Sequence, residues 1–377
     1  MRPPVGFSVS NHLTLPNPNK EIDFVLFSQY NSIVGINMFN FRIWGDNLGI
    51  DLGTTNTLVY AKRRKGVVLN IPSVMAIGRK DGRILAIGKE AKEMVGKTPE
   101  NIVAVRPMQD GVIADFDIAQ KMMRYFIDQV QPRRLLMGPK LIIGVPFQAT
   151  KVEKRAVVEI AMQIGARRVH LVAEPVAAAI GANLPISEAL GNLIVDIGGG
   201  TSEAAITSLN GVVICRTIRI AGDEMDQAVI QHLRDHHSLV IGEQMAERIK
   251  IEIGCVCVSA HNEKMKVRGR DLNTGFPNEI EIDSEEVSSI FSPVVDTICE
   301  MIEATLEESP PELSGDIMER GLYLTGGVAC LRGLDKYISQ RTGLTVHLAE
   351  EPLLSVVMGI GKLLKDRQLL SLVEMTP

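Results

Sequence analysis

One short pattern occurs twice in this chain: an apolar strand ends in Asp-x-Gly, and a turn rich in Gly and Thr follows. The first copy is LGIDLGTTNT, residues 48–57, and the second is LIVDIGGGT, residues 193–201. Each copy places a carboxylate beside free backbone N–H groups, and glycine lets that backbone approach a phosphate closely. Two copies in halves of similar size predict a nucleotide held between two related lobes, each binding the phosphates and a Mg²⁺ from its own side.

The order of elements predicts a mixed α/β fold. Apolar residues recur at helical spacing over 116–130, and the apolar run 141–145 before Pro146 is typical of a buried parallel strand. The Ala-rich segment 176–181 indicates a helix packed tightly against another element. Further strands are expected at 48–52, 57–62, 67–69, 73–77, 84–87, 169–173, 193–197, 203–208, 212–219 and 321–325, and further helices at 150–164, 223–236, 243–252, 285–306 and 354–365. Strands that alternate with helices twice over indicate two layered lobes.

Bulk properties exclude several classes of protein. A chain of 377 residues exceeds one ordinary core, and a net charge of −5 without a basic stripe argues against a nucleic-acid partner. Five scattered cysteines favour reduced thiols in a cytosolic protein over a disulfide framework. We find no run of about 18 apolar residues and no signal-peptide pattern, so we expect no membrane span and no secretion.

Two aspartates and one glutamate are the candidate chemical groups. Asp51 and Asp196 each end a predicted strand, which is where open α/β sheets bind ligands, and paired carboxylates suit Mg²⁺. Capping of a turn explains either Asp alone, but the matched Gly and Thr neighbours favour the metal site. Glu174 precedes Pro175 at a predicted helix start, where it either caps the helix or orients an attacking water; the residues alone leave both open.

Two other patterns are weaker. Gly326 and Gly327 close a third apolar strand and would let the backbone lie flat against an adenine or ribose, although Gly-Gly is also common in plain turns. His232, His236 and His237 lie on a predicted helix, and the i, i+4 pair is a possible ligand pair. No carboxylate or further histidine at metal spacing is evident nearby, so the pattern favours a solvated helix face.

At this point the chain resembles a known family. The three motifs, in this order, are similar to the phosphate-1, phosphate-2 and adenosine motifs of the ATPase superfamily of actin, DnaK-type chaperones and sugar kinases. Within it, four segments closely resemble the MreB family of bacterial actin-like filament proteins: RPMQDGVIAD at 106–115, IRIAGDEMD at 218–226, AERIKIEIG at 246–254 and ERGLYLTGG at 319–327. The resemblance covers about residues 47–370.

The resemblance implies an actin-like ATPase fold: α/β, with two lobes that each hold a mixed β-sheet flanked by helices, and four subdomains. An N-terminal extension over 1–43 would come first. The implied subdomains are IA (44–75, 109–188 and 354–377), IB (76–108), IIA (189–224 and 289–353) and IIB (225–288).

The resemblance also implies the roles of site residues. Glu174 and Thr201 would position the hydrolytic water, and Asp51 and Asp196 would lie near Mg²⁺ and the phosphates of ATP. The residues implied to bind the nucleotide are Asp51, Gly53, Thr54, Thr55, Asn56, Asp196, Gly198, Gly199, Gly200, Glu247, Lys250, Gly326 and Gly327. The chain departs from the family at Ser202, where a second Thr is common, and at Val328, where a third Gly is common and where valine narrows the adenosine side.

Two apolar segments are candidate membrane contacts. Residues 38–44 are short, apolar and aromatic, and family members commonly begin with an amphipathic segment on the inner membrane face. Residues 135–137 follow Arg133 and Arg134 at the position of the family's membrane-inserting loop. The contact residues would be Phe39, Phe41, Ile43, Trp44, Leu135, Leu136 and Met137. Packing on the protein itself is the alternative for both. Whether Met38 is the true start of the chain stays open.

The leading functional hypothesis is an ATP-dependent, membrane-associated filament protein that determines rod shape by organising peptidoglycan synthesis. It would polymerise with itself into double protofilaments, bind the anionic inner face of the cell membrane from the cytoplasm and work with the cell-wall elongation machinery. Its weak ATPase would time assembly. The alternatives are a chaperone-type ATPase, which needs a substrate-binding domain after the lobes, and a small-molecule kinase, which needs a catalytic base near a sugar pocket. The residues do not distinguish ATP from GTP.

Overall fold

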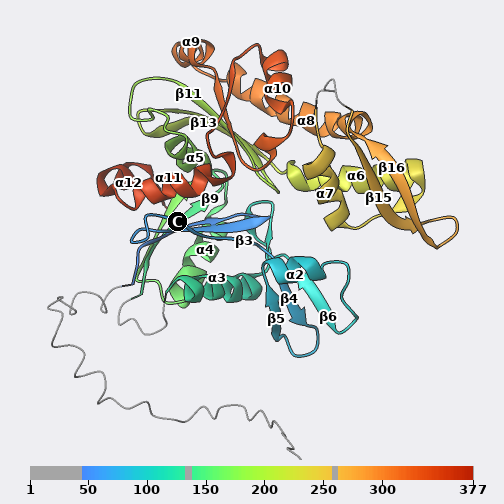
Figure 1. Cartoon of the computed structure of the whole chain (residues 1–377). Coiled ribbons are helices and arrows are strands. Elements are labelled where there is room, and N and C mark those ends of the chain that lie inside the picture. Colours follow the sequence, from blue (N-terminus) through green and yellow to red (C-terminus); the bar gives the residue numbers. More distant parts are fainter. Residues whose placement is uncertain (1–44, 132–137, 257–261, 377) are drawn as a thin grey trace, which may run out of the picture. The chain divides into compact units, whose positions relative to one another are not determined.

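The computed structural model describes residues 45–131, 138–256 and 262–376 (Figure 1). The predicted membrane contacts lie outside these ranges and stay predictions: Phe39, Phe41, Ile43, Trp44, Leu135, Leu136 and Met137. Among the helices in the described ranges, none is both long enough and apolar enough to cross a bilayer.

The first large sheet has six strands in the order β19-β10-β9-β1-β2-β3. Its central strand β1 pairs antiparallel with β2 and parallel with β9, and β9 pairs parallel with β10. The predicted parallel strand at 141–145 is therefore confirmed. The strands are β1 (Leu48–Leu52), β2 (Asn56–Ala61), β3 (Gly66–Pro72), β9 (Lys140–Val145), β10 (Arg168–Ala173) and β19 (Glu374–Met375).

Helices cover both faces of this sheet, which explains the continuous apolar run in β9. Leu141 and Ile143 pack in one core with α3 (Phe116–Val130) and α4 (Lys151–Gln163). Ile142, whose side chain points the other way, packs in a second core. That core is formed with α5 (Glu174–Gly181), α11 (Ser355–Leu363) and α12 (Arg367–Val373).

The second large sheet repeats the arrangement of the first. Its order is β13-β12-β11-β17-β18, and its central strand β11 again pairs antiparallel with the next strand and parallel with a third. The strands are β11 (Asn192–Ile197), β12 (Ser202–Ser208), β13 (Gly211–Ile218), β17 (Leu322–Thr325) and β18 (Val346–Leu348). The helices of this half are α6 (Gly222–His237), α7 (Glu243–Ile253), α8 (Ser284–Glu307), α9 (Pro311–Arg320) and α10 (Leu334–Thr342).

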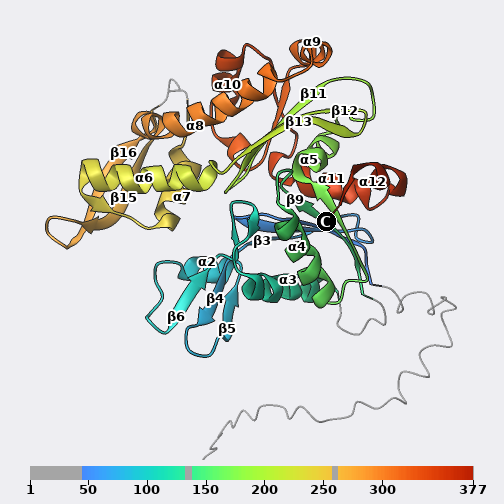
Figure 2. The ribbon, with the colours of Figure 1, turned by 180° about the vertical axis from the view of Figure 1, so that it is seen from behind.

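Helices α5 and α11 lie between the two large sheets (Figures 1 and 2). Ile194 and Ala205 of the second sheet pack in the same core as Ile142 of the first. The two helices approach so closely that a Cβ on Gly181 would lie 1.9 Å from the carbonyl oxygen of Ser355. The tight packing predicted for the Ala-rich segment is therefore confirmed.

Two three-stranded sheets and one two-stranded sheet complete the described chain. One three-stranded sheet has the order β5-β4-β6 and carries α2, and the other has the order β14-β15-β16. Their elements are β4 (Met75–Gly78), β5 (Ile84–Ile87), α2 (Lys89–Met94), β6 (Ile102–Val105), β14 (Leu239–Val240), β15 (Lys264–Asp271) and β16 (Pro277–Asp283). The short strands β7 (Met108–Gln109) and β8 (Val112–Ile113) pair with each other, and the 3₁₀ turns η3 (Val328–Cys330) and η4 (Pro352–Leu354) follow later. The predicted subdomain boundaries remain predictions.

The α/β class with two helix-flanked sheets is confirmed, whereas some elements differ from expectation. The helix predicted at 354–365 is preceded by a 3₁₀ turn, and α12 follows it as a separate helix. Asp366 starts α12, because its side chain accepts a hydrogen bond of 2.9 Å from the backbone N–H of Leu369. Helices α2, α9, α10 and α12 were not predicted, since each has at most ten residues and so shows its apolar period only briefly.

Candidate functional site

A cavity of about 490 Å³ lies where β1 and β11 end, a size within the range that small-molecule ligands occupy. Both repeated loops line it. The structure brings together every residue predicted to bind nucleotide or water: Asp51, Gly53, Thr54, Thr55, Asn56, Glu174, Asp196, Gly198, Gly199, Gly200, Thr201, Glu247, Lys250, Gly326 and Gly327.

The two aspartates occupy matching places in the two sheets. Asp51 of β1 lies opposite Gly144 of the parallel neighbour β9. Asp196 of β11 lies opposite Thr325 of the parallel neighbour β17, whose hydroxyl donates a hydrogen bond of 2.9 Å to it. The repeat seen in the sequence is therefore a repeat in space, and both carboxylates border the same cavity.

Four carboxyl groups share this region: Glu203 is buried, and the other three are half-buried in the cavity wall. Burial and the charge of Asp196 raise the pKa of Asp51 to about 7. Burial raises the pKa of Asp196 to about 6, against the opposing effect of the Thr325 hydrogen bond. Burial, Glu203 and both aspartates hold the pKa of Glu174 well above its usual range. Like charges at low dielectric constant destabilise one another, so this site favours the entry of a cation.

The residues fit a Mg²⁺–nucleotide on two observations. Carboxylate and hydroxyl oxygens are the ligands that Mg²⁺ prefers. The glycines let the loops meet closely at the cavity: a Cβ on Gly199 would lie 1.9 Å from Thr55 Oγ1, and one on Gly200 would lie 3.0 Å from the backbone nitrogen of Asp110. The first loop is further held because Thr54 Oγ1 accepts a hydrogen bond of 2.9 Å from Gly111 N–H.

Glu174 is the first residue of α5, and Ala173 occupies the N-cap position. Glu174 is therefore not the N-cap residue itself, but its acidic side chain in the first turn suits the helix dipole, and both interpretations stay open. The carboxylate also borders the cavity, and a Cβ on Gly144 would lie 3.3 Å from Glu174 Cγ. Its role with water stays a prediction.

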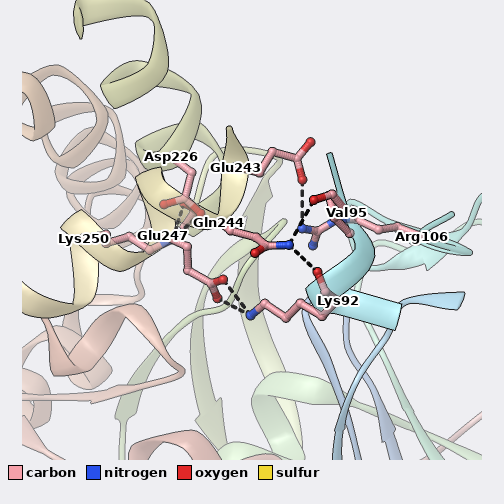
Figure 3. Close-up of polar contacts among 9 residues, drawn as sticks. Lys92, Val95, Arg106, Asp226, Glu243, Gln244, Glu247 and Lys250 are labelled. Carbon is pink, nitrogen blue, oxygen red and sulfur yellow. Dashed lines mark hydrogen bonds and ion pairs between the residues drawn. The ribbon is translucent and has the colours of Figure 1, made fainter. Parts of the chain in front are cut away.

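Helix α7 connects the cavity to the small sheet that carries α2 (Figure 3). Glu247 Oε2 lies 2.6 Å from Lys92 Nζ, and Gln244 Nε2 donates to the carbonyl oxygens of Lys92 and Val95 at 2.5 and 3.0 Å. Lys250 Nζ donates to the Gly222 carbonyl at 2.7 Å. Two residues predicted to flank the ribose therefore already have protein partners, and their nucleotide contacts stay predictions.

Several lining residues were not predicted. Leu331, Arg332, Leu353 and Val356 also border the cavity. The first two follow the Gly326–Gly327 turn closely in sequence, which is a signal that could have found them. Leu353 comes from η4 and Val356 from the start of α11, far along the chain, and only the tertiary fold brings them to the site.

Most of the described part of the chain matches known proteins in sequence. A model of the MreB/Mbl protein family matches residues 45–372. The cell shape-determining protein MreB of Escherichia coli K12 is 47% identical over 329 residues, which is 86% of this chain and 94% of that protein. The cell shape-determining protein Mbl of Bacillus subtilis is 42% identical over 320 residues, 85% of this chain and 96% of that protein.

Solved structures with a similar fold also match this chain. The crystal structure of MreB 5 of Spiroplasma citri bound to AMPPNP has a TM-score of 0.82 at 35% identity, over 85% of this chain and 96% of that one. The MamK double helical filament shares the fold, with a TM-score of 0.73 at 24% identity over 85% and 99% of the two chains. With the family matched over 45–372, the chain belongs to the MreB/Mbl family.

Proposed function

We propose that this chain is an actin-like cytoskeletal protein of the cell-shape-determining class, which binds ATP and Mg²⁺ and assembles with itself into filaments. One observation carries the proposal: two matching Asp-x-Gly loops, from two separate sheets, border one cavity together with Glu174. The family membership and the names of its relatives support the cell-shape role.

Nucleotide binding is supported by the relative MreB 5, which has been solved with AMPPNP and with ADP. We assign Asp51 and Asp196 to the metal and the glycine-rich backbone of both loops to the phosphates. Bound Mg²⁺ supplies charge neutralisation at the phosphates. The 2.9 Å hydrogen bond from Thr325 orients the Asp196 carboxylate toward this task.

For hydrolysis we assign Glu174 and Thr201 to the attacking water. Glu174 lies at the rigid start of α5, so its carboxylate keeps a fixed place in the cavity wall. Phosphoryl transfer to water depends mainly on positioning and on charge neutralisation. Positive charge entering the cavity lowers the pKa of Glu174 and favours the carboxylate that can accept a hydrogen bond from water.

The finer parts of the proposal rest on the sequence resemblance. Residues 38–44 and 135–137 would hold the filament on the anionic inner face of the cell membrane, where the cell-wall elongation machinery would be its partner. A short segment with few charges binds lipid weakly by itself. Many copies along one filament would bind strongly through avidity.

The test uses the full chain with ATP and Mg²⁺, and vesicles of phosphatidylcholine with or without phosphatidylglycerol. We expect filaments in negative stain, co-sedimentation with the anionic vesicles only, and slow phosphate release that follows assembly. A chain that binds ATP but stays monomeric under every condition overturns the filament. ATP consumption in proportion to an added sugar indicates the kinase alternative.

Variants separate the parts of the proposal. Glu174→Gln should keep nucleotide binding and lose about a hundredfold in phosphate release, as expected for loss of a catalytic base. Glu159→Gln, an exposed carboxylate on α4, is the matched control. Trp44→Ser and Leu136→Ser should reduce vesicle binding and leave ATP turnover unchanged. Their control is Leu372→Ser, which changes an exposed leucine of α12.

A further inference from the structure

Two histidines of α6 and one glutamate of α8 converge at a site away from the nucleotide cavity. His232 Nε2 lies 2.9 Å and His237 Nε2 lies 2.5 Å from the same atom, Glu286 Oε1. The sequence favoured a solvated helix face without a carboxylate nearby. The expectation of no nearby carboxylate was wrong, because the fold brings in Glu286 from about 50 residues further along the chain, whereas His236 is exposed as predicted.

The fold holds the three side chains from both sides. His237 is the last residue of α6, and Ser238 ends the helix in a left-handed conformation with φ of 51°. Glu286 lies in the first turn of α8, where its backbone N–H donates a 3.0 Å hydrogen bond to the capping residue Asp283. Buried residues of both helices, among them Leu233 and Val287, pack in one core.

The ligand set is one that binds zinc. Two imidazole nitrogens and one carboxylate oxygen, with the fourth position left to water, form a recurrent Zn²⁺ site. Here one such atom from each of the three residues lies within 4.8 Å of the other two. Ligand atoms around a tetrahedral zinc are about 3.3 Å apart, so the imidazoles need to withdraw from the carboxylate by less than about 1 Å to admit the ion.

The partial exposure of the three side chains suits a site that takes up a metal ion from solvent. The side chains of His232, His237 and Glu286 are 22, 29 and 24% exposed, so an ion can reach them while part of their hydration is already lost. The ring of His236 lies against that of His232, with the ring centroids 4.4 Å apart and the planes tilted by 31°. We infer that His232, His237 and Glu286 form a binding site for a divalent transition metal, with Zn²⁺ the best match.

The metal would connect two elements that reach different parts of the molecule. Helix α6 begins at Gly222, which borders the nucleotide cavity, and its 16 residues span about 24 Å to His237. At that end the ion would join the end of α6, which directly precedes β14, to the start of α8, which directly follows β16. The expected effect is a more stable β14-β15-β16 unit, since a ligand that binds only the folded state stabilises it.

The test is zinc binding to the full chain without nucleotide. After treatment with EDTA and its removal, the protein competes with a chromogenic chelator for Zn²⁺, and Co²⁺ reports the coordination geometry by its visible spectrum. We expect one ion per chain, a tetrahedral cobalt spectrum and a higher melting temperature with zinc. His237→Gln and Glu286→Gln should each weaken binding by at least about tenfold.

Two controls separate this site from loose binding to surface residues. His347→Gln removes an exposed histidine elsewhere, and Glu285→Gln removes the exposed carboxylate beside Glu286. Both should bind zinc as the unaltered chain does. The inference is overturned if the chain binds no zinc, or if the four variants bind it equally, because the three side chains then form only hydrogen bonds. His237→Gln decides the matter should Glu286→Gln not fold.

Discussion

Lys92 Nζ lies 2.6 Å from Glu247 Oε2, so an ion pair joins the small sheet that follows β3 to the helix that borders the nucleotide cavity (Figure 3). The contact extends along α7, where Glu243 pairs with Arg106 at 3.0 Å and Gln244 bonds the carbonyl oxygens at the end of α2. Glu247 also lines the cavity, so the same side chain belongs to this contact and to the candidate nucleotide site.

Lys92→Met should speed nucleotide release by about twofold to fivefold. The side chains of the pair are only 27 and 21% exposed, so its loss costs about 0.5–1 kcal/mol of contact between the halves. Stopped-flow release of a fluorescent ATP analogue measures the rate. Lys89→Met, an exposed lysine on the same helix, should leave it unchanged. Equal rates for both variants would show that the ion pair does not hold the halves together.

Glu203 should give the nucleotide-free protein a characteristic pH dependence. Its carboxylate accepts hydrogen bonds from Phe147 N–H at 3.0 Å and Thr217 Oγ1 at 2.6 Å, yet burial raises its pKa from 4.5 to about 7. Between these values the folded state holds a proton that the unfolded state has lost. The contribution of Glu203 to the free energy of unfolding therefore falls as pH rises from about 4.5 to about 7 and is flat on either side.

Glu203→Gln should remove this contribution. The difference in unfolding free energy between the unaltered chain and the variant should shrink by about 3 kcal/mol as pH rises from 4.5 to 7.5, measured by urea denaturation in EDTA. The slope is the readout, because the amide also leaves a buried N–H₂ group where Glu203 Oε2 has no hydrogen-bond partner among the described residues. Glu159→Gln should follow the unaltered chain. Identical slopes for Glu203→Gln and the unaltered chain would contradict the assignment.

The residues of the candidate site could be predicted from the sequence more fully than the contacts around that site. Asp51 and Asp196 were predictable because the chemistry of each lies in a few consecutive residues, and the repeat connects the two. Two contacts were not predictable. Lys92 and Glu247 are 155 positions apart, and His237 and Glu286 are 49 positions apart. Sequence periodicity reports which face of an element is apolar, and it does not report which elements meet.

Lys250 and Asp226 should behave as a coupled pair. Their side chains are 17 and 13% exposed at a separation of 2.8 Å, and burial raises the pKa of Asp226 to about 6 although Lys250 opposes this. Lys250→Met leaves the carboxylate without its cation and should lower the unfolding free energy by about 2–3 kcal/mol. Urea denaturation measures the change.

The double variant Lys250→Met with Asp226→Asn tests the coupling. It should be more stable than Lys250→Met alone, because an amide costs less to bury than an unpaired carboxylate. If the loss of stability in the double variant equals the sum of the losses in Lys250→Met and Asp226→Asn, the two side chains stabilise the fold independently.

The last prediction concerns the helices between the two sheets. A Cβ on Gly359 of α11 would lie 1.8 Å from the carbonyl oxygen of Ala177 in α5, so the backbones touch and neither can yield as a side chain would. Gly359→Ala must push α5 and α11 apart and should lower the unfolding free energy by about 2–3 kcal/mol. Thermal melting without nucleotide measures the loss. Since α5 begins at Glu174, the same variant should also slow phosphate release.

Gly315→Ala is the matched control, because a Cβ there meets nothing within 4 Å and the residue lies inside α9. Alanine favours a helix over glycine by about 0.5–1 kcal/mol, so this variant should melt at a slightly higher temperature. A lower melting temperature for Gly359→Ala and a higher one for Gly315→Ala would identify backbone contact between α5 and α11 as the cause of the loss in stability. A melting temperature unchanged in Gly359→Ala would instead mean that the two helices separate at little cost, and that the sheets are held together chiefly by the contacts of α7 with α2.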